Sequence, residues 1–228
     1  MSSATEVWSR FIERYAVLQS AVPLFDADTN GSVRIRTIGR GRTERQILSR
    51  SPKMESLVRS EVALLERDWN SSPRRLDGLI YMAGLRRDQS FVPIYIGKTE
   101  AEGRLGGNFS ANVTRIAADT TKFARWGDGY AYHVGDLSAC VLPGHDERKK
   151  TAKYQAWARA MFLDVPCATP RLKEPILFWC KAWDRGDVGV WEELGPTRLT
   201  FLEYLLIGVG SMCFEQLLNR EGQARDRA

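Results

Sequence analysis

The sequence predicts a mixed α/β protein of the α+β type, with a small, mostly antiparallel central sheet flanked by helices. Two apolar segments, 76–84 and 91–97, are separated by a short polar connection, which predicts a β-hairpin. A third segment, 174–183, is rich in aromatic and β-branched residues and is expected to form another strand. Several other segments repeat apolar residues at helical spacing, and these are expected to cover the sheet.

The helices are predicted from apolar spacing and from residue types at their ends. Ser51 and Pro52 suit the N-cap and first position of one helix, and Pro196 lies near the start of another, over 196–210. A further helix is expected over 149–163. An N-terminal helix is expected over 6–18, and the apolar stripe of this helix consists of Val7, Trp8, Phe11, Ile12 and Tyr15. The stripe of the helix that begins at Ser51 consists of Met54, Leu57, Val58, Val62 and Leu65.

The remaining segments give weaker patterns. Residues 33–38 alternate apolar and basic side chains, which predicts a half-buried strand with Arg34 and Arg36 on its outer side. Residues 129–135 resemble an additional strand, and 110–126 have room for a short helix. The last residues, 223–228, are polar and are expected to be disordered.

The composition is that of a cytoplasmic globular protein. The chain has 228 residues, of which 43% are hydrophobic, and no apolar run approaches the ~20 residues needed to cross a membrane. Its N-terminus lacks the pattern of a signal peptide. The cysteines form no CxxC pair, so reduced thiols are expected, and the spacing of Cys140, His145 and Cys167 does not suit zinc.

The charge of the chain favours a polyanionic partner, because 33 lysines and arginines face 28 acidic residues, a net charge of +5. Arginine binds phosphate through two parallel hydrogen bonds, so the arginine-rich run beginning at Arg34 is interpreted as an arm that contacts DNA. A solvated strand and loop is the alternative. The residues assigned to nucleic-acid binding are Arg34, Arg36, Arg40, Arg42, Arg45 and Arg125.

Two motifs are set aside. Residues 26–31 match the first half of a calcium-binding EF-hand loop, but Thr37 stands where the twelfth-position glutamate belongs. Asp and Asn in this stretch are explained by turns in which side chains bond to the backbone. The IGKT sequence at 96–99 lacks the preceding P-loop glycine, since that position is Val92.

A third group of residues carries more specific information. Gly78–Tyr81 reads GLIY and Tyr95–Thr99 reads YIGKT, on the two strands of the predicted hairpin, and Arg104 follows. Glu203 lies among leucines on a later helix, where a carboxylate is costly unless it is paired or binds a metal. Asn219 follows near the end.

In this order, the residues resemble the GIY-YIG nuclease superfamily, which includes homing endonucleases, a repair-incision subunit and some type II restriction enzymes. The first motif is one residue longer than the family pattern, and Asn108 stands where some relatives have histidine. Arg115 and Arg125 therefore stay open as alternatives to Arg104 for the catalytic arginine.

The resemblance implies a GIY-YIG-like catalytic domain over 76–228 with a large insertion at about 105–175, preceded by an N-terminal helical and basic extension over 1–75. The two additional regions would supply target recognition. A restriction role would further imply a homodimer, because two strands must be cut.

The resemblance also implies a metal-dependent DNA endonuclease that hydrolyses phosphodiester bonds. Glu203 would hold Mg²⁺ or Mn²⁺, and Arg104 would bind a non-bridging phosphate oxygen. Tyr81 would act as general base or position the water, which requires a nearby cation because a free phenol has a pKa of ~10.

The other family positions receive supporting roles. Tyr95 would orient the phosphate or the water, and Lys98 would lower a tyrosine pKa or act as base. Asn219 would donate a hydrogen bond to the phosphate. Two further hypotheses stay open: a catalytically inactive nucleic-acid-binding protein with a GIY-YIG-like fold, and an interaction protein with a coincidental hairpin.

Overall fold

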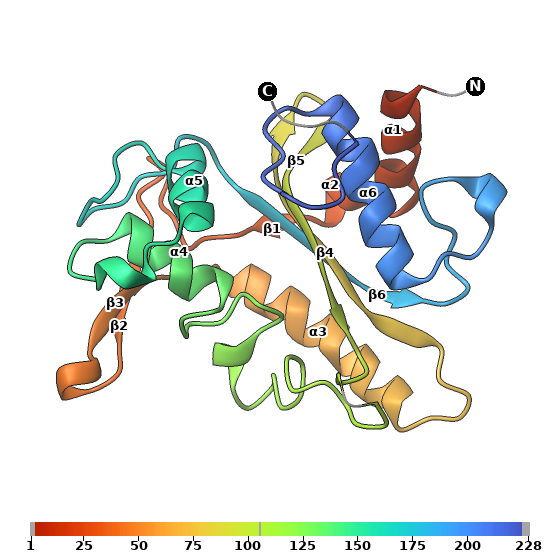
Figure 1. The fold of residues 1–228 in the computed structure, drawn as a ribbon, viewed down its shortest axis with the longest axis horizontal. Coiled ribbons are helices and arrows are strands. Elements are labelled where there is room, and N and C mark those ends of the chain that lie inside the picture. The colour runs from red at the N-terminus through yellow and green to blue at the C-terminus, as the bar shows by residue number, and fades with distance from the viewer. Residues whose placement is uncertain (1–2, 105, 225–228) are drawn as a thin grey trace. The chain divides into compact units, whose positions relative to one another are not determined.

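A computed structural model describes residues 3–104 and 106–224 and confirms the mixed α/β class with an antiparallel sheet (Figure 1). The chain forms two compact units, each assembled from separate segments. Unit 1 contains 1–22, 57–114 and 177–228, and unit 2 contains 23–56 and 115–176. These units cut across the predicted division into 1–75 and 76–228, because the N-terminal helix belongs with the hairpin, and 23–56 joins most of the predicted insertion.

Unit 1 is organised around an antiparallel sheet with the strand order β1-β6-β4-β5. The predicted hairpin is confirmed, and both strands are longer than expected because they continue to a tight turn at Asp88, whose φ is 50°. The third predicted strand is also confirmed and pairs with the other side of β4. The strands are β1 (Val22–Pro23), β4 (Leu76–Arg87), β5 (Ser90–Glu100) and β6 (Leu177–Asp184).

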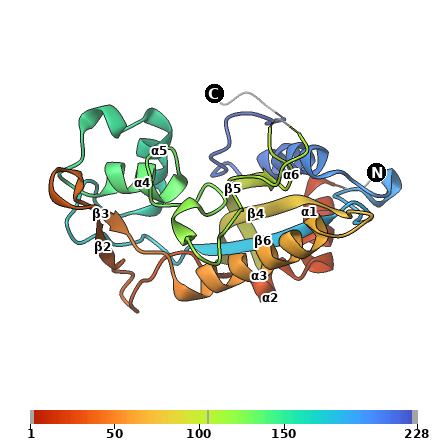
Figure 2. The same cartoon turned by 90° about the horizontal axis from the view of Figure 1, so that it is seen from below.

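Helices cover both faces of this sheet, and Figure 2 shows α6 and α3 on opposite sides. Apolar side chains of α6 pack with Ile80, Met82 and Ile96, and α1 joins the same core, where the Trp8 indole N–H donates to Phe91 O at 3.0 Å. The helices of unit 1 are α1 (Ala4–Arg14), α2 (Val17–Ser20), α6 (Leu199–Cys213) and the part of α3 (Pro52–Trp69) from Leu57 onward.

The predicted start of α3 is confirmed, because the Ser51 hydroxyl accepts the backbone N–H of Met54 at 3.0 Å. The predicted helix over 196–210 is α6, which continues past Gly210 to Cys213. Both helices present apolar stripes to the core, which explains why the sequence revealed them.

Unit 2 contains a short hairpin and two helices. The hairpin consists of β2 (Ile35–Ile38) and β3 (Arg45–Leu48), joined through a 3-10 turn, Gly41–Thr43. The helices are α4 (His133–Val141) and α5 (Ala152–Met161), and α5 confirms the helix predicted over 149–163.

Two predictions for unit 2 were wrong. Residues 129–135 do not form a strand, because Ala131 has a φ of 70° and α4 begins at His133. The expected helix over 110–126 is replaced by turns and a 3-10 segment, Thr120–Lys122, since Arg115, Ala124 and Arg125 all have positive φ. Positive φ at non-glycine residues ends regular strand or helix.

Other expectations concern single features. The Asp28 carboxylate accepts the backbone N–H groups of Asn30 and Ser32, each at 2.9 Å, which confirms a side-chain turn in the EF-hand-like stretch. All four cysteines have free thiols. Within the described ranges, no helix combines the length and the apolar character that a bilayer crossing requires. Of the predicted tail, 225–228 lie outside the described residues.

Candidate active site

The two predicted tyrosines lie together on one face of the unit 1 sheet. Tyr81 on β4 pairs with Gly97 on β5, and Tyr95 lies two residues before Gly97, so alternation puts both phenol rings on the same face. Their ring centroids are 6.3 Å apart, and Phe178 of β6 stacks on Tyr81 at 6.1 Å. Tyr81 is buried, with 1% of its surface exposed, whereas Tyr95 is half-buried.

The side chain of Tyr81 reaches across to the edge strand β5. A Cβ atom placed on Gly97 would lie 2.7 Å from both Cζ and the hydroxyl oxygen of Tyr81. The phenol therefore occupies the space that any side chain at position 97 would need. This contact gives the glycine of the YIG motif a geometric role, which is to leave room for the hydroxyl end of the Tyr81 ring over β5.

Lys98 lies on the opposite face of the sheet from the tyrosines. It pairs with Ile80, whose side chain belongs to the core beneath α6. Its ammonium group is 2.6 Å from the Glu100 carboxylate, and the Thr200 hydroxyl donates to the same carboxylate at 3.0 Å. The positive charge of Lys98 is thus directed to Glu100, and the hydrogen bonds of Glu100 to Lys98 lower the pKa of this carboxyl group.

Glu203 reaches the same edge of β5 from α6, and its carboxylate accepts the backbone N–H of Lys98. Burial raises the pKa of Glu203; Lys98 lowers it in part, while Glu100 and Glu221 raise it further. Helix α6, which carries Glu203, therefore lies on one face of the sheet, and the phenol rings of Tyr81 and Tyr95 lie on the other. Because Gly97 and Lys98 are consecutive, the Tyr81 hydroxyl and the Glu203 carboxylate contact neighbouring residues of β5 from opposite faces of the sheet.

Asn219 is bound to this edge as well. Its side-chain oxygen accepts the N–H of Ile96 at 3.0 Å, and its amide nitrogen donates to the carbonyl of Ile96 at 2.8 Å. The neighbouring backbone N–H of Leu218 donates to Ile94 O at 2.7 Å. The buried Asn219 side chain thus bonds to the outer edge of β5 as a further strand would. These bonds use its side-chain oxygen and one of its two N–H donors.

Arg104 is exposed and borders a cleft of about 420 Å³ beside the end of β5. Glu100, the ion-pair partner of Lys98, and Thr200 line the same cleft. The other charged residues of its wall are Arg74, Asp77, Glu102, Arg185 and Arg198. The alternatives Arg115 and Arg125 belong to unit 2, whereas Arg104 shares unit 1 with the remaining predicted site residues.

Asp77 organises the wall of this cleft. Its carboxylate accepts hydrogen bonds from Arg198 at 2.6 and 2.9 Å and from Arg185 at 2.9 Å, and it also accepts the backbone N–H of Leu199 at 3.3 Å. Burial on its own would raise the pKa of Asp77, but these hydrogen bonds hold the pKa below its ordinary value. Asp77 therefore fixes both arginines and the first turn of α6.

Sequence reasoning did not identify Asp77, Glu100, Thr200 or Arg198. Only Glu100 left a local signal, because residues two apart on a strand share a face and a Lys-Thr-Glu sequence brings opposite charges together. Asp77 and Arg198 are 121 residues apart, so their pairing depends on the tertiary fold.

The carboxylates at the edge of β5 are the candidates for holding a divalent cation. Within 3–104 and 106–224, no group of three or more His, Cys, Asp or Glu side chains is arranged to bind a metal. Mg²⁺ needs fewer protein ligands, since it is commonly bound through one or two carboxylates plus waters and phosphate oxygens. Burial is the largest cause of the raised pKa of Glu203, and the negative charges of Glu100 and Glu221 raise it further; only this second contribution, nearby negative charge, also favours a metal cation.

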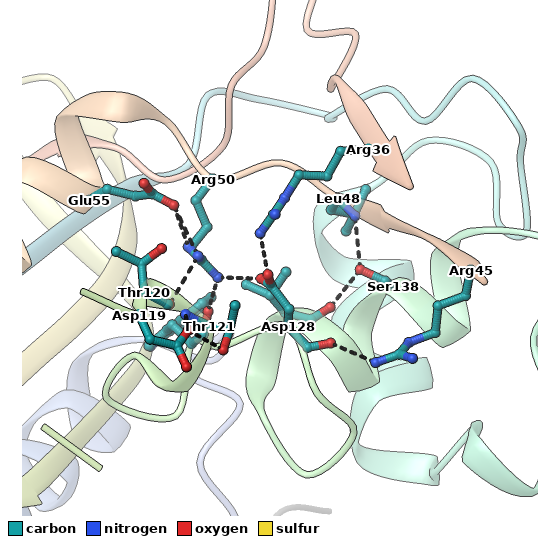
Figure 3. A network of polar contacts seen from close by, with 12 residues as sticks. Arg36, Arg45, Leu48, Arg50, Glu55, Asp119, Thr120, Thr121, Asp128 and Ser138 are labelled. Atoms are coloured by element: carbon teal, nitrogen blue, oxygen red, sulfur yellow. Dashed lines mark hydrogen bonds and ion pairs between the residues drawn. The ribbon is translucent and has the colours of Figure 1, made fainter. Parts of the chain in front are cut away.

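The arginines assigned to nucleic-acid binding all lie in unit 2, in two different states. Arg34, Arg36, Arg40, Arg42 and Arg125 are exposed, and Arg45 is half-buried. Arg36 and Arg45 bind Asp128, Arg36 through the carboxylate and Arg45 through the backbone oxygen at 3.4 Å (Figure 3). Arg125 also donates to Ala131 O at 3.2 Å.

Comparison with protein-family models, curated proteins and solved structures finds no match to this chain.

Proposed function

We propose that the protein is a metal-dependent DNA endonuclease that hydrolyses phosphodiester bonds beside the edge strand β5. The observation that carries the proposal is the approach of two reactive groups to consecutive residues: the Tyr81 hydroxyl above Gly97, and the Glu203 carboxylate on the N–H of Lys98. The adjoining cleft contributes Arg104 and three further arginines, which suit the phosphates of a DNA backbone.

Each residue has a role that follows from its position. Glu203 would hold the cation, and a bound Mg²⁺ would supply Lewis-acid polarisation of the phosphate and acidify a water. Tyr81 would position the attacking water, and Tyr95, which is nearer to solvent, would orient the phosphate. Arg104 would bind a non-bridging oxygen as negative charge develops.

Lys98 and Asn219 have supporting roles in this proposal. Lys98 holds the Glu100 carboxylate in place through their 2.6 Å ion pair, which also lowers the pKa of Glu100. Asn219 holds the edge of β5 through Ile96 and has a second amide hydrogen with which to bind a phosphate oxygen.

The experiment is cleavage of supercoiled plasmid and of linear duplexes by the purified full chain, in parallel reactions with Mg²⁺, Mn²⁺ or EDTA. We expect cutting with either metal and none with EDTA. Glu203→Gln and Tyr81→Phe should each abolish cutting, while the matched control Glu193→Gln, an exposed acid in unit 1, should cut normally. Full cutting by Glu203→Gln would remove Glu203 from the mechanism.

A second candidate is a nucleic-acid-binding protein without catalysis. The observation that favours it is the Lys98–Glu100 ion pair, because an ammonium group already neutralises one of the two carboxylates available to a cation. This candidate predicts salt-sensitive DNA binding that is unaffected by Mg²⁺ or EDTA, with no cutting.

For the endonuclease function, a restriction role would require two active sites, so we propose a cytoplasmic homodimer. Cross-linking during the cleavage assay tests this.

A further inference from the structure

The hairpin of β2 and β3 in unit 2 is a narrow ribbon with strong positive charge. Its strands pair in antiparallel register from Ile35 opposite Leu48 to Ile38 opposite Arg45. Residues 33–48 contain five arginines and one acidic residue, Glu44. The positive charges of this element therefore exceed its negative charges five to one.

The tip of the ribbon has a defined shape. Gly39 has a φ of 83°, and a Cβ there would lie 2.3 Å from the backbone oxygen of Thr43, so only glycine fits. The Thr43 hydroxyl donates to Arg40 O at 2.9 Å and accepts the Arg40 N–H at 3.2 Å. These bonds hold the backbone that presents the exposed side chains of Arg40 and Arg42.

The base of the ribbon is fixed by a buried polar network centred on Asp128 (Figure 3). The Asp128 carboxylate, with 4% of its side chain exposed, binds Arg36 from β2 and Arg50 from the residues after β3. Arg50 is fully buried and also binds Glu55 at 2.9 Å. The backbone N–H of Leu48 donates to the Ser138 hydroxyl at 3.0 Å. The ribbon is thus held at its base on both strands.

We infer that this ribbon is a DNA-reading arm that enters the major groove, where Arg40 and Arg42 recognise guanine. The inference rests on the proposed function and specifies its substrate as duplex DNA with guanine at the contacted positions. The major groove, about 12 Å wide, admits a two-stranded β-ribbon. Arginine bonds both O6 and N7 of guanine through its planar fork, which is the commonest specific contact to a base.

The arginines of the ribbon fall into two groups, those that hold the ribbon in place and those that are free to contact bases. Arg36 and Arg45 are engaged with Asp128, so their role is to position the ribbon. Arg40 and Arg42 lie at the tip and are exposed, and within the described residues neither has an ion-pair partner. Arg34 lies near the base, where its Nε is 3.7 Å from an Asp26 carboxylate oxygen; 80% of its side chain is exposed, so its remaining N–H groups suit a phosphate. Double-stranded RNA suits the ribbon less, because its major groove is deep and narrow.

The test is selection of binding sites from a randomised DNA duplex by the full chain in EDTA, which blocks cutting, followed by anisotropy titration of the selected duplex. The variants are Arg40→Lys and Arg42→Lys, which keep the charge and lose the fork. The control is Arg148→Ala in the same unit, whose side chain is 88% exposed. Circular dichroism melting verifies that each variant is folded.

We expect the wild type to select duplexes with guanine at fixed positions. Each lysine variant should lose preference at one position and about 5- to 150-fold in affinity for the selected duplex, with little change for unselected DNA. Arg148→Ala should match the wild type. The inference is overturned if a lysine variant retains the guanine preference, if affinity falls equally for all sequences, or if duplex RNA competes as well as DNA.

The two proposals fail in different ways. A protein that cuts DNA with Mg²⁺ but selects no guanine, or selects it unchanged in both lysine variants, retains the endonuclease function and loses the reading arm. A protein that selects guanine through Arg40 and Arg42 without cutting retains the arm and loses the endonuclease.

Discussion

The Tyr81 ring and Gly97 are in van der Waals contact across two paired strands, and the hydroxyl end of the ring fills the position of the missing side chain. The two residues face each other because Tyr81 on β4 and Gly97 on the outer strand β5 are partners in the register of the hairpin. The contact brings a polar atom of a buried residue over the edge strand of the sheet.

Gly97→Ala is therefore expected to displace the Tyr81 ring. The added methyl group would lie 2.7 Å from two ring-end atoms, and overpacking of this kind costs roughly 1–3 kcal/mol of unfolding free energy. DNA cutting should fall by at least tenfold, while DNA affinity is retained. Urea denaturation and plasmid cleavage measure the two effects.

Gly208→Ala is the matched control for that substitution. Gly208 lies within α6, and the nearest atom to an added Cβ is 3.7 Å away, so the methyl group fits. Alanine at this position should stabilise the helix by about 0.5–1 kcal/mol and leave cutting unchanged. Equal losses in both variants would mean that the Tyr81 contact is not what position 97 requires.

Glu203→Gln is expected to stabilise the protein at neutral pH while abolishing cutting. Because the folded-state pKa is raised above 4.5, the folded protein binds this proton more tightly than the unfolded chain does. The unfolding free energy therefore decreases as pH rises from about 4.5 through the folded pKa, and glutamine removes this decrease.

Thermal denaturation of both proteins between pH 4 and 8 measures this difference. The gap in stability should open as pH rises and should be smallest at the acid end. Metal-dependent cutting by the wild type should also decline on the acid side at a pH above 4.5, where Glu203 becomes protonated. A gap that is constant with pH would show that Glu203 does not titrate with a raised pKa.

Asp128→Ala is expected to destabilise unit 2 by about 3–5 kcal/mol, because it leaves the fully buried guanidinium of Arg50 without one of its two carboxylate partners. Hydrogen exchange should show loss of protection in β2 and β3. Asp146→Ala, which removes an exposed partner of Arg148, should change stability little. Similar melting of the two variants would contradict a supporting role for the Asp128 network.

Asn219→Leu is expected to cost roughly 1–3 kcal/mol, since leucine has the same branched outline but leaves the N–H and carbonyl of Ile96 unbonded. The effect should appear as faster amide exchange of Ile96 and Leu218, measured by NMR. If exchange at Ile96 is unchanged, the Asn219 bonds do not secure the edge.

The sequence revealed the parts of the fold in which local pattern and tertiary role coincide. The β4–β5 hairpin follows from two apolar runs with a short connection, and α3 follows from its Ser51 cap and apolar stripe. Helix α4 was missed because all of its residues are buried, so it has no polar face to produce a period. Ala131, with positive φ, also interrupts an alternation that looked like a strand.

Only the contacts of the candidate site that lie within the hairpin were predictable from the sequence. The proximity of Tyr81 and Tyr95 follows from the hairpin, whereas the separation of Lys98 from both follows from strand alternation, which the motif alone does not convey. The Asp77 contacts with Arg185 and Arg198, and the Asn219 contacts with Ile96, join residues more than a hundred positions apart. No local pattern specifies such pairs.

The interleaved composition of the two units has a consequence for synthesis on the ribosome. Unit 2 is complete once residue 176 has been made, but unit 1 still lacks β6 and α6, which come from 177–228. Its hairpin must wait for the strand that pairs with β4 and for the helix that covers one face. Such long-range contacts form slowly, so the apolar surfaces of α1 and of the nascent hairpin stay exposed until 177–228 have been made, and these are the segments for which chaperone protection matters most.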